Sequence, residues 1–518
     1  MAGRRLMTST CPRPSGDGPP SASAGGASSA DGVGPRGDDP PSTPRRGAGS
    51  ANGVGPRGDD PPSTPRRGAS SAKIVLSGCQ VVTMNPRRDR YASGYISVDG
   101  TQITEVGPGP VPERLAGARQ IDAIGCLATP GLVNTHHHLY QWATRGRAVD
   151  ATLFGWLTEL YPVWARIDEQ IVRAASTAAL TWLARSGCTT TTDHHYVFPR
   201  DGGDVLGATV ESAAEVGLRF HPTRGSMDLG ESDGGLPPDD VVEQIDTIIG
   251  ATQAAIERFH DPSPGSMLRI GVAPCSPFSV TRDLLTESAA LARSSRVRLH
   301  THLAETADED DYCAEHFGCT PAEYLDSLGW LGGDVWLAHC VHLDDAGIAR
   351  LAAAGTGVAH CPGSNARLGA GICRTRALLD AGVPVGLGVD GAASNEASSL
   401  LGEVSEATRF ARAVGGPQAI TAAQALELGT LGGARLLGRA AEIGSLEPGK
   451  LADIALWRLD ELPHAGITDP VAALVLGPPP PLELLLVNGR LVVERDRVVT
   501  VDEQQVAQAA RRLSLPGE

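Results

Sequence analysis

The sequence has no cysteine framework, no long apolar run and no excess of basic residues. Its 10 cysteines form no CxxC pair and no regular spacing, so we expect reduced thiols and a cytoplasmic protein. No window approaches the run of about 20 apolar residues that a membrane span needs, and no apolar signal segment follows Arg4 and Arg5. The net charge of −16 disfavours binding to a phosphate backbone. We expect a small-molecule ligand and neither nucleic-acid nor membrane partners, and the sequence leaves a homo-oligomer open.

The first part of the chain has the composition of a disordered tail. Residues 1–71 are rich in Gly, Pro, Ser, Ala and Arg, and the block GVGPRGDDPPSTPRRGA begins at Gly32 and again at Gly53. Such a segment has too few large apolar side chains to offset the entropy lost on ordering. We therefore predict a low-complexity, disordered tail over residues 1–71.

Short β-like segments follow the tail and recur near the end of the chain. KIVLSGCQVVTM, YISVDG and TQITEVG lie within 72–129, and LADIALW, LELLLVNGRLVVE and RVVTVD lie within 438–518. Asn488-Gly489 fits a hairpin turn, because both residues tolerate positive φ. We predict one small β-sandwich domain that is built from both ends, 72–129 and 438–518.

Between these flanks, over 130–437, β-like runs alternate with helical segments such as IDEQIVRAASTAALTWLARSG. The ends of these runs are Asn134, Asp193, Thr223, Ala273, His302, His339, His360 and Asp390. Eight runs are the number that a closed (β/α)8 barrel needs, so the predicted fold class is α/β with a TIM barrel. Catalytic groups of such barrels lie at the C-terminal ends of the strands, where this chain repeatedly places His or Asp.

Four of these residues fit a catalytic metal site. Alternate side chains of a strand share a face, so His136 and His138 can point together into the barrel while His137 points away. This pair alone is weak evidence, but His302 adds a third nitrogen and Asp390 an oxygen. Water would occupy the open position that chemistry requires. We predict that these four residues bind one divalent ion, either zinc or iron.

The chain from about Lys73 to Asp502 resembles the amidohydrolase superfamily. The strings that carry the resemblance are PGLVNTHHH, LHTHLAET, LAHCVHL, HCPGSN, GLGVDGAASN, GSLEPGKLADIALW and LLVNGR. Strand four ends in Val272-Ala273-Pro274-Cys275 and lacks the lysine that forms the carbamate bridge of two-metal members. The resemblance therefore implies a metal-dependent hydrolase of C–N bonds with a single ion.

Three residues are predicted to carry out catalysis beside that ion. Glu305 lies three residues past His302, where its carboxylate can exchange protons with the attacking water without binding the ion, and Asp390 shares the transfer. His339 resembles the family histidine that faces the substrate and stabilises charge that develops on it. An N-terminal helix carboxylate and a buried structural histidine are the simpler alternatives for Glu305 and His339.

A further resemblance suggests the substrate. NTHHHLYQ, TTTTDHHYVFP and HPTRGSMDLG are similar to strings of 8-oxoguanine deaminases, which form urate and ammonia from this purine. The resemblance implies that Gln141 binds the purine edge and Arg224 the ring carbonyl, and His195 and Tyr196 are candidates for the C8 oxygen. Guanine, a pterin or an s-triazine are alternative substrates, and a catalytically silent scaffold is the non-enzyme alternative.

Overall fold

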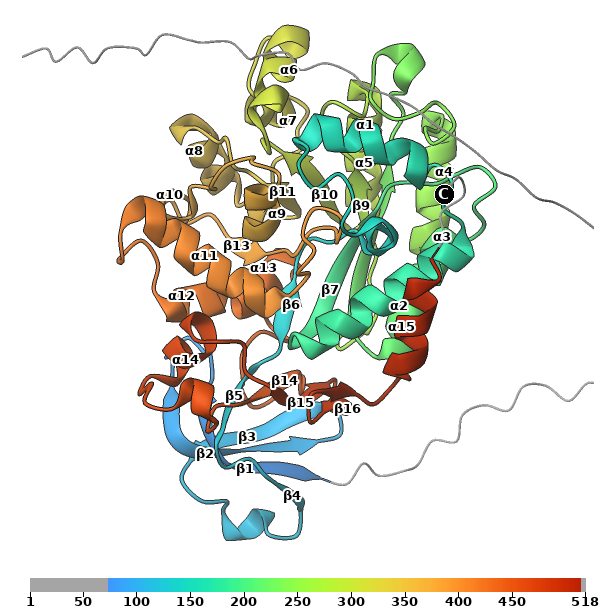
Figure 1. The fold of residues 1–518 in the computed structure, drawn as a ribbon. Helices are drawn as coiled ribbons and strands as arrows, with labels where there is room; N and C mark the ends of the chain where they lie inside the picture. The colour runs from blue at the N-terminus through green and yellow to red at the C-terminus, as the bar shows by residue number, and fades with distance from the viewer. Residues whose placement is uncertain (1–72, 514–518) are drawn as a thin grey trace, which may run out of the picture. The chain divides into compact units, whose positions relative to one another are not determined.

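The computed structural model describes residues 73–513, which all belong to the compact unit Gly68–Glu518. The predicted tail, residues 1–71, lies outside the described residues. Eight parallel strands form a closed barrel in the order of the chain, as the alternating pattern predicts (Figure 1). They are β6 (Leu132–Asn134), β7 (Cys188–His195), β8 (Arg219–Ser226), β9 (Gly271–Pro274), β10 (Arg298–Leu303), β11 (Val335–His339), β12 (Gly357–His360) and β13 (Val385–Leu387).

Helices surround the barrel and follow most of its strands (Figure 1). Their bounds are α1 (Leu153–Trp164), α2 (Glu169–Arg185), α3 (Val205–Val216), α4 (Ile245–Phe259), α5 (Arg282–Ser295), α6 (Ala307–Phe317), α7 (Pro321–Ser327), α8 (Asp345–Ala354), α9 (Pro362–Arg367), α10 (Thr375–Asp380), α11 (Leu400–Gly415), α12 (Ala422–Glu427), α13 (Gly433–Leu436), α14 (Pro470–Leu476) and α15 (Glu503–Arg511). Several start at a side-chain cap; Asp168, for example, accepts a hydrogen bond from the amide of Ile171 at the start of α2.

The two β-rich flanks form one hydrogen-bonded sheet in addition to the barrel, which confirms that segments from both ends of the described residues build a separate β-structure. From the first flank come β1 (Ile74–Val82), β2 (Arg90–Asp99), β3 (Gln102–Pro108), β4 (Arg119–Asp122) and β5 (Cys126–Pro130), and from the second β14 (Ile454–Arg458), β15 (Leu482–Val487), β16 (Arg490–Glu494) and β17 (Arg497–Val498). Antiparallel pairing of β5 with β14 joins the flanks. Asn488 and Gly489 both have positive φ in the β15–β16 hairpin, as predicted.

A buried ion pair connects this sheet with the barrel. Arg219 at the start of β8 donates from Nε and Nη2 to the carboxylate of Asp453, which immediately precedes β14, at 3.3 and 3.1 Å. Both side chains are almost fully buried. Asp453 precedes β14, which pairs with β5, and β5 leads into β6. The ion pair therefore lies close to the strand that His136 and His138 follow.

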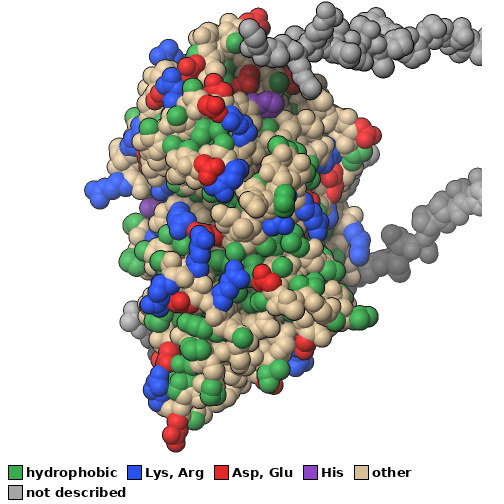
Figure 2. Space-filling view, turned by 90° about the vertical axis from the view of Figure 1, so that its left-hand side faces the viewer, with side chains coloured by type: hydrophobic (Ala, Val, Ile, Leu, Met, Phe, Trp, Pro, Cys, Tyr) green, Lys and Arg blue, Asp and Glu red, His purple; other side chains and the backbone are tan. Residues whose placement is uncertain are grey.

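On the surface, acidic and basic side chains are interspersed on the face that Figure 2 shows. Exposed ion pairs of the molecule include Arg350–Asp326 and Arg376–Asp380. Within the described range, no helix is both long and apolar enough to cross a membrane.

Candidate metal centre and pocket

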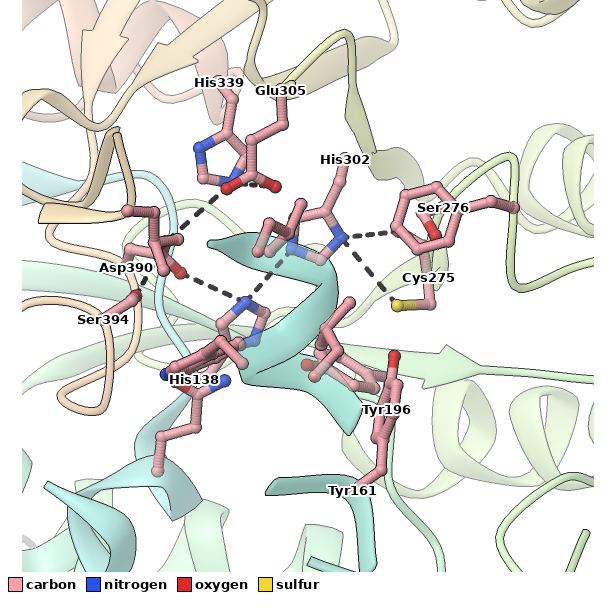
Figure 3. Close-up of a pocket in the computed structure, with 16 residues that line it drawn as sticks. His138, Tyr161, Tyr196, Cys275, Ser276, His302, Glu305, His339, Asp390 and Ser394 are labelled. Carbon is pink, nitrogen blue, oxygen red and sulfur yellow. Dashed lines mark hydrogen bonds and ion pairs between the residues drawn. The ribbon is translucent and has the colours of Figure 1, made fainter. Parts of the chain in front are cut away.

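The predicted metal and catalytic residues converge at the C-terminal ends of the barrel strands. His136 and His138 directly follow β6, and His302 lies in β10. Glu305 lies just past β10, His339 ends β11, and Asp390 follows β13 in a turn. Figure 3 shows five of these residues around one space: His138, His302, Glu305, His339 and Asp390. All of them are at most 8% exposed, so the cluster is shielded from bulk water.

The hydrogen bonds of the three predicted histidine ligands define which ring nitrogen carries the proton. His138 Nδ1 donates to the carbonyl of His194 at 2.7 Å, and His302 Nδ1 donates to the carbonyl of Cys275 at 2.6 Å. His300 Nδ1 donates to a backbone carbonyl, so its Nε2 accepts from His136 Nδ1 at 2.8 Å. Each Nε2 of His136, His138 and His302 is therefore left as an unprotonated lone pair.

These lone pairs face one another and a carboxylate. His138 Nε2 lies 3.1 Å from His302 Nε2, and Asp390 Oδ1 lies 3.3 Å from Nε2 of both His136 and His138. His136 Nε2 is buried without a hydrogen-bond partner. Electron-rich atoms held this close repel one another unless a cation lies between them. Three imidazole nitrogens and one carboxylate oxygen are the donor set that zinc-type ions prefer, so the residues present fit such an ion.

His194, at the end of β7, also contributes a nitrogen to this cluster. Its Nε2 donates to the carbonyl of Ala273 at 2.9 Å, which leaves Nδ1 as an unpartnered lone pair. The ligand atoms of His136, His138, His194 and His302 all lie within 4.8 Å of one another. From the sequence, His194 is not expected among the ligands, because the four predicted ligands already complete the coordination.

Asp390 is held as a carboxylate by its surroundings. Ser364 Oγ and Ser394 Oγ donate to its Oδ2 at 2.6 and 3.3 Å, and the amide of Gly391 donates to its Oδ1. Burial favours the neutral acid, but the facing imidazole of His136 and the further histidines hold the pKa of Asp390 well below its usual range. A permanently charged oxygen ligand is therefore available to a cation.

Glu305 and His339 form a second pair beside the ligand cluster. Glu305 Oε2 lies 3.6 Å from His339 Nε2, and His339 Nδ1 donates to Asn365 Oδ1 at 2.9 Å. Burial raises the pKa of Glu305 to about 7. Burial alone would lower the pKa of His339, but the carboxylates of Glu305 and Asp390 outweigh it and raise that pKa. A carboxyl group with a pKa near 7 is suited to accept and return a proton.

A buried carboxylate fixes the backbone that presents Glu305. Glu309, in the first turn of α6, accepts hydrogen bonds from the amides of Ala304 and Glu305 at 2.9 and 3.1 Å. Ala304 has a φ of 50°, and His339 and Asp390 also have positive φ, at 69° and 62°. Such conformations cost about 1–3 kcal/mol each and persist only where surrounding contacts enforce them.

A pocket of about 380 Å³ opens beside the cluster and has mostly apolar walls. Its walls come largely from α1, which supplies Leu153, Trp156, Leu157 and Tyr161. Trp156 Nε1 donates to the carbonyl of Ala393 at 3.1 Å and so ties α1 to the turn that follows Asp390. The predicted catalytic residues Glu305, His339 and Asp390 form part of the polar lining of the pocket (Figure 3).

The predicted substrate contacts divide into two groups. Gln141 and Tyr196 line the pocket, and both polar atoms of the Gln141 amide are buried without a hydrogen-bond partner. A Cβ on Gly391 would lie 1.7 Å from Gln141 Oε1, so only glycine leaves room for this amide. Arg224 and His195 are not among the lining residues: Arg224 Nη2 pairs with Glu243, and His195 Nε2 donates to the carbonyl of Val197.

Several residues of the site were not predicted from the sequence. They are Trp156 and Tyr161 of α1, Ser364 and Asn365 near the start of α9, and Glu309. Two signals could have found some of them. Ser364 and Asn365 lie in the HCPGSN string, and residues 153–164 hold an unusual share of the aromatic side chains in a chain that has only 4%.

Residues 127–492 match the Amidohydrolase family. The chain is 48% identical over 405 residues to the 8-oxoguanine deaminase of Pseudomonas aeruginosa. The aligned region covers 77% of this chain and 89% of that protein. The chain is also 38% identical to an isoxanthopterin deaminase from an unknown prokaryotic organism, over 81% of this chain and 90% of the relative. Among solved structures, the atrazine chlorohydrolase of Arthrobacter aurescens complexed with zinc superposes with a TM-score of 0.81 at 33% identity, over 85% of this chain and 99% of that one.

Together, the barrel, the cluster at its strand ends and these similarities define a class of enzyme, the metal-dependent hydrolases. The chain belongs to the amidohydrolase family and hydrolyses C–N bonds.

Proposed function

We propose that this chain is a deaminase that converts 8-oxoguanine and water to urate and ammonia. The observation that carries the proposal is the pocket itself, which is lined by the Gln141 amide, without a hydrogen-bond partner among the described residues, as well as by Glu305, His339 and part of the ligand cluster. An amide offers a donor and an acceptor side by side, which suits the lactam and neighbouring nitrogen of a purine. The 48% identity with an 8-oxoguanine deaminase supports this substrate over others.

In this proposal, His136, His138, His302 and Asp390 hold one zinc-type ion. The ion would supply Lewis acidity and lower the pKa of water. Glu305 accepts the proton that water loses as its oxygen bonds to the aminated ring carbon C2, and then returns it to the ring nitrogen or to the departing amine. His339 Nε2 lies 3.6 Å from Glu305 and 3.8 Å from Asp390, where it stabilises charge that develops on the substituents of the attacked carbon.

The proposed substrate contacts follow from the shape of the pocket. Gln141 and Tyr196 bind polar edges of the ring, and the α1 side chains Trp156 and Leu157 exclude water from its faces. Arg224 and His195 also belong to the proposal. Arg224 would reach the ring carbonyl only by releasing Glu243, to which its Nη2 is bonded at 2.7 and 2.8 Å.

The test is kcat/KM for 8-oxoguanine, guanine, isoxanthopterin and a chloro-triazine, all measured on one preparation of known metal content. We expect a clear preference for 8-oxoguanine. A preference for another of the four would refute the substrate and leave the hydrolase assignment intact. Metal analysis of the same preparation tests the ion, and less than roughly half an equivalent per chain would favour the scaffold alternative.

A further inference from the structure

A second cavity, of about 590 Å³, lies at the opposite end of the barrel from the pocket described above. Its lining residues come from the beginnings of barrel strands: His221 from β8, Arg269 from the segment before β9, and Arg298 from the first position of β10. His260 and Arg296 complete the polar lining. The other lining residues are apolar side chains or glycine, so no carboxylate lines this cavity.

Several buried nitrogens in and beside the cavity have no hydrogen-bond partner among the residues that the structure describes. These atoms are Nδ1 of His221, Nε of Arg269, Nε of Arg298 and Nη1 of Arg439, the residue after the lining Gly438. His221 is only 2% exposed, so bulk water does not satisfy its Nδ1. Unsatisfied buried polar atoms are rare in folded proteins, and their presence here shows that the protein itself does not fully compensate the positive charge of this region.

The neighbouring carboxylates compensate only part of this positive charge. Glu442 pairs with Arg269 and Arg439, and Asp453 is engaged by Arg219. Within the described part of the chain, Arg296 and Arg298 have no carboxylate at ion-pair distance; Arg298 Nη2 donates instead to the carbonyl of Gly333 at 2.9 Å. Desolvation lowers the pKa of Arg298 to about 10. The carboxylate of Asp334 opposes this shift, and the negative charge of an anion in the cavity would compensate further for the lost solvation.

The backbone also leaves room for the Arg298 guanidinium. Gly438 has a φ of +66°, and a Cβ there would lie 3.0 Å from Arg298 Nη1. The guanidinium therefore lies against this glycine, which also lines the cavity. Arginine donors arranged in this way match the several acceptor oxygens of a phosphate group better than a single carboxylate oxygen.

We propose that this cavity binds a phosphate group, either inorganic phosphate or the phosphate of a small phosphorylated metabolite. The site is separate from the catalytic pocket: the two share no lining residue, and this cavity lies near the starts of barrel strands, whereas the proposed metal ligands lie at or beyond strand ends. The proposal does not depend on which ring the enzyme deaminates.

Calorimetric titration of the metal-loaded enzyme at constant ionic strength tests the site. The two probes are inorganic phosphate and a nucleoside 5′-monophosphate. We expect saturable binding of at least one of them with one site per chain, and the tighter probe identifies the source of the phosphate. Absence of saturable binding for both would overturn the proposal.

Variants connect any binding with this cavity. Arg298→Gln and Arg296→Gln should each weaken binding about tenfold, because each removes a charge-assisted donor. Arg282→Gln, an exposed arginine at the start of the preceding helix α5, is the matched control and should bind as the wild type does. The proposal would be overturned if neither cavity substitution weakened binding. It would also be overturned if the bound anion inhibited 8-oxoguanine turnover competitively, because the anion would then bind at the metal. Thermal unfolding of each variant verifies that it is folded.

Discussion

At the scale of single residues, the proton positions of the histidines decide what the cluster can hold. The Nδ1–H of each predicted histidine ligand donates a hydrogen bond to a fixed acceptor. The acceptor is a backbone carbonyl for His138 and His302, and His300 Nε2 for His136. Because the proton of each ring is on Nδ1, the Nε2 atoms cannot form hydrogen bonds with one another. A sequence reveals the HxH spacing but not these acceptors, because they come from β7, β9 and β10, which meet the ligands only in the folded barrel.

Replacement of a ligand should therefore remove the ion together with the activity. His302→Ala removes the Nε2 that lies 3.1 Å from His138 Nε2, and outer-shell contacts cannot replace a lost nitrogen ligand. We expect metal content well below half an equivalent per chain and loss of turnover, measured by elemental analysis and a rate assay. His316→Ala, on the exposed face of α6, is the control. Full metal content in His302→Ala would remove His302 from the ligand set.

Glu305→Gln should separate catalysis from metal binding. The amide keeps the size of the side chain but cannot accept the proton of water, so we expect full metal content and a rate lower by about 10²-fold or more. The control is Glu315→Gln in helix α6. Because Glu315 is exposed, this substitution should leave the rate unchanged. A Glu305→Gln enzyme that turns over at nearly the wild-type rate would contradict the role of Glu305 as proton carrier.

The pKa of Glu305 also predicts the pH dependence. Burial raises this pKa to about 7 from the ordinary value of 4.5, so the acceptor form is lost as the pH falls through about 7. We expect kcat/KM to decline on the acid side with an apparent pKa near 7, measured over roughly pH 5 to 9. A decline centred near 4.5 would show that the group behaves as an exposed glutamate.

At the scale of elements, the strands were predictable and the pocket wall was not. The eight barrel strands alternate with helices, and polar residues at their ends indicate the catalytic face, so sequence pattern suffices for both. Helix α1 is different, because it lines the pocket only through its position against the turn after β13, a contact across more than 200 residues. Arg224 illustrates the same limit: its pairing with Glu243 depends on the loop between β8 and α4.

Loosening α1 should weaken substrate binding more than it slows the chemical step. Trp156→Phe keeps an aromatic wall but removes the hydrogen bond to the Ala393 carbonyl, worth about 1 kcal/mol. We expect KM to rise by roughly fivefold with a smaller change in kcat. Trp182→Phe removes the analogous bond from an exposed indole to the Ala397 carbonyl outside the pocket and should leave KM unchanged. Equal effects of both substitutions would argue against a specific role of α1.

At the scale of the whole described unit, the β-sheet and the barrel are connected by charge as well as by apolar packing. Arg219 and Asp453 are each about 0–2% exposed in their side chains, so each is an uncompensated buried charge once the other is removed. Asp453 also accepts a hydrogen bond from the amide of Asn488, which fixes the β15–β16 hairpin against the barrel. The contact spans 234 residues of sequence, and neither residue stood out in the sequence analysis.

A double-mutant cycle should expose this connection. Asp453→Asn and Arg219→Met each leave one buried charge without its partner, and we expect each to lower the free energy of unfolding by about 3–5 kcal/mol. The double variant should lose clearly less than the sum of the two, because it leaves neither charge alone. Denaturant unfolding measures all four proteins, and Arg350→Met, which breaks an exposed pair, should cost less than about 1 kcal/mol. If the two losses are simply additive, the ion pair does not couple sheet and barrel, and apolar contacts such as that of the Trp457 ring of β14 with Gly187, which precedes β7, would have to hold the two together.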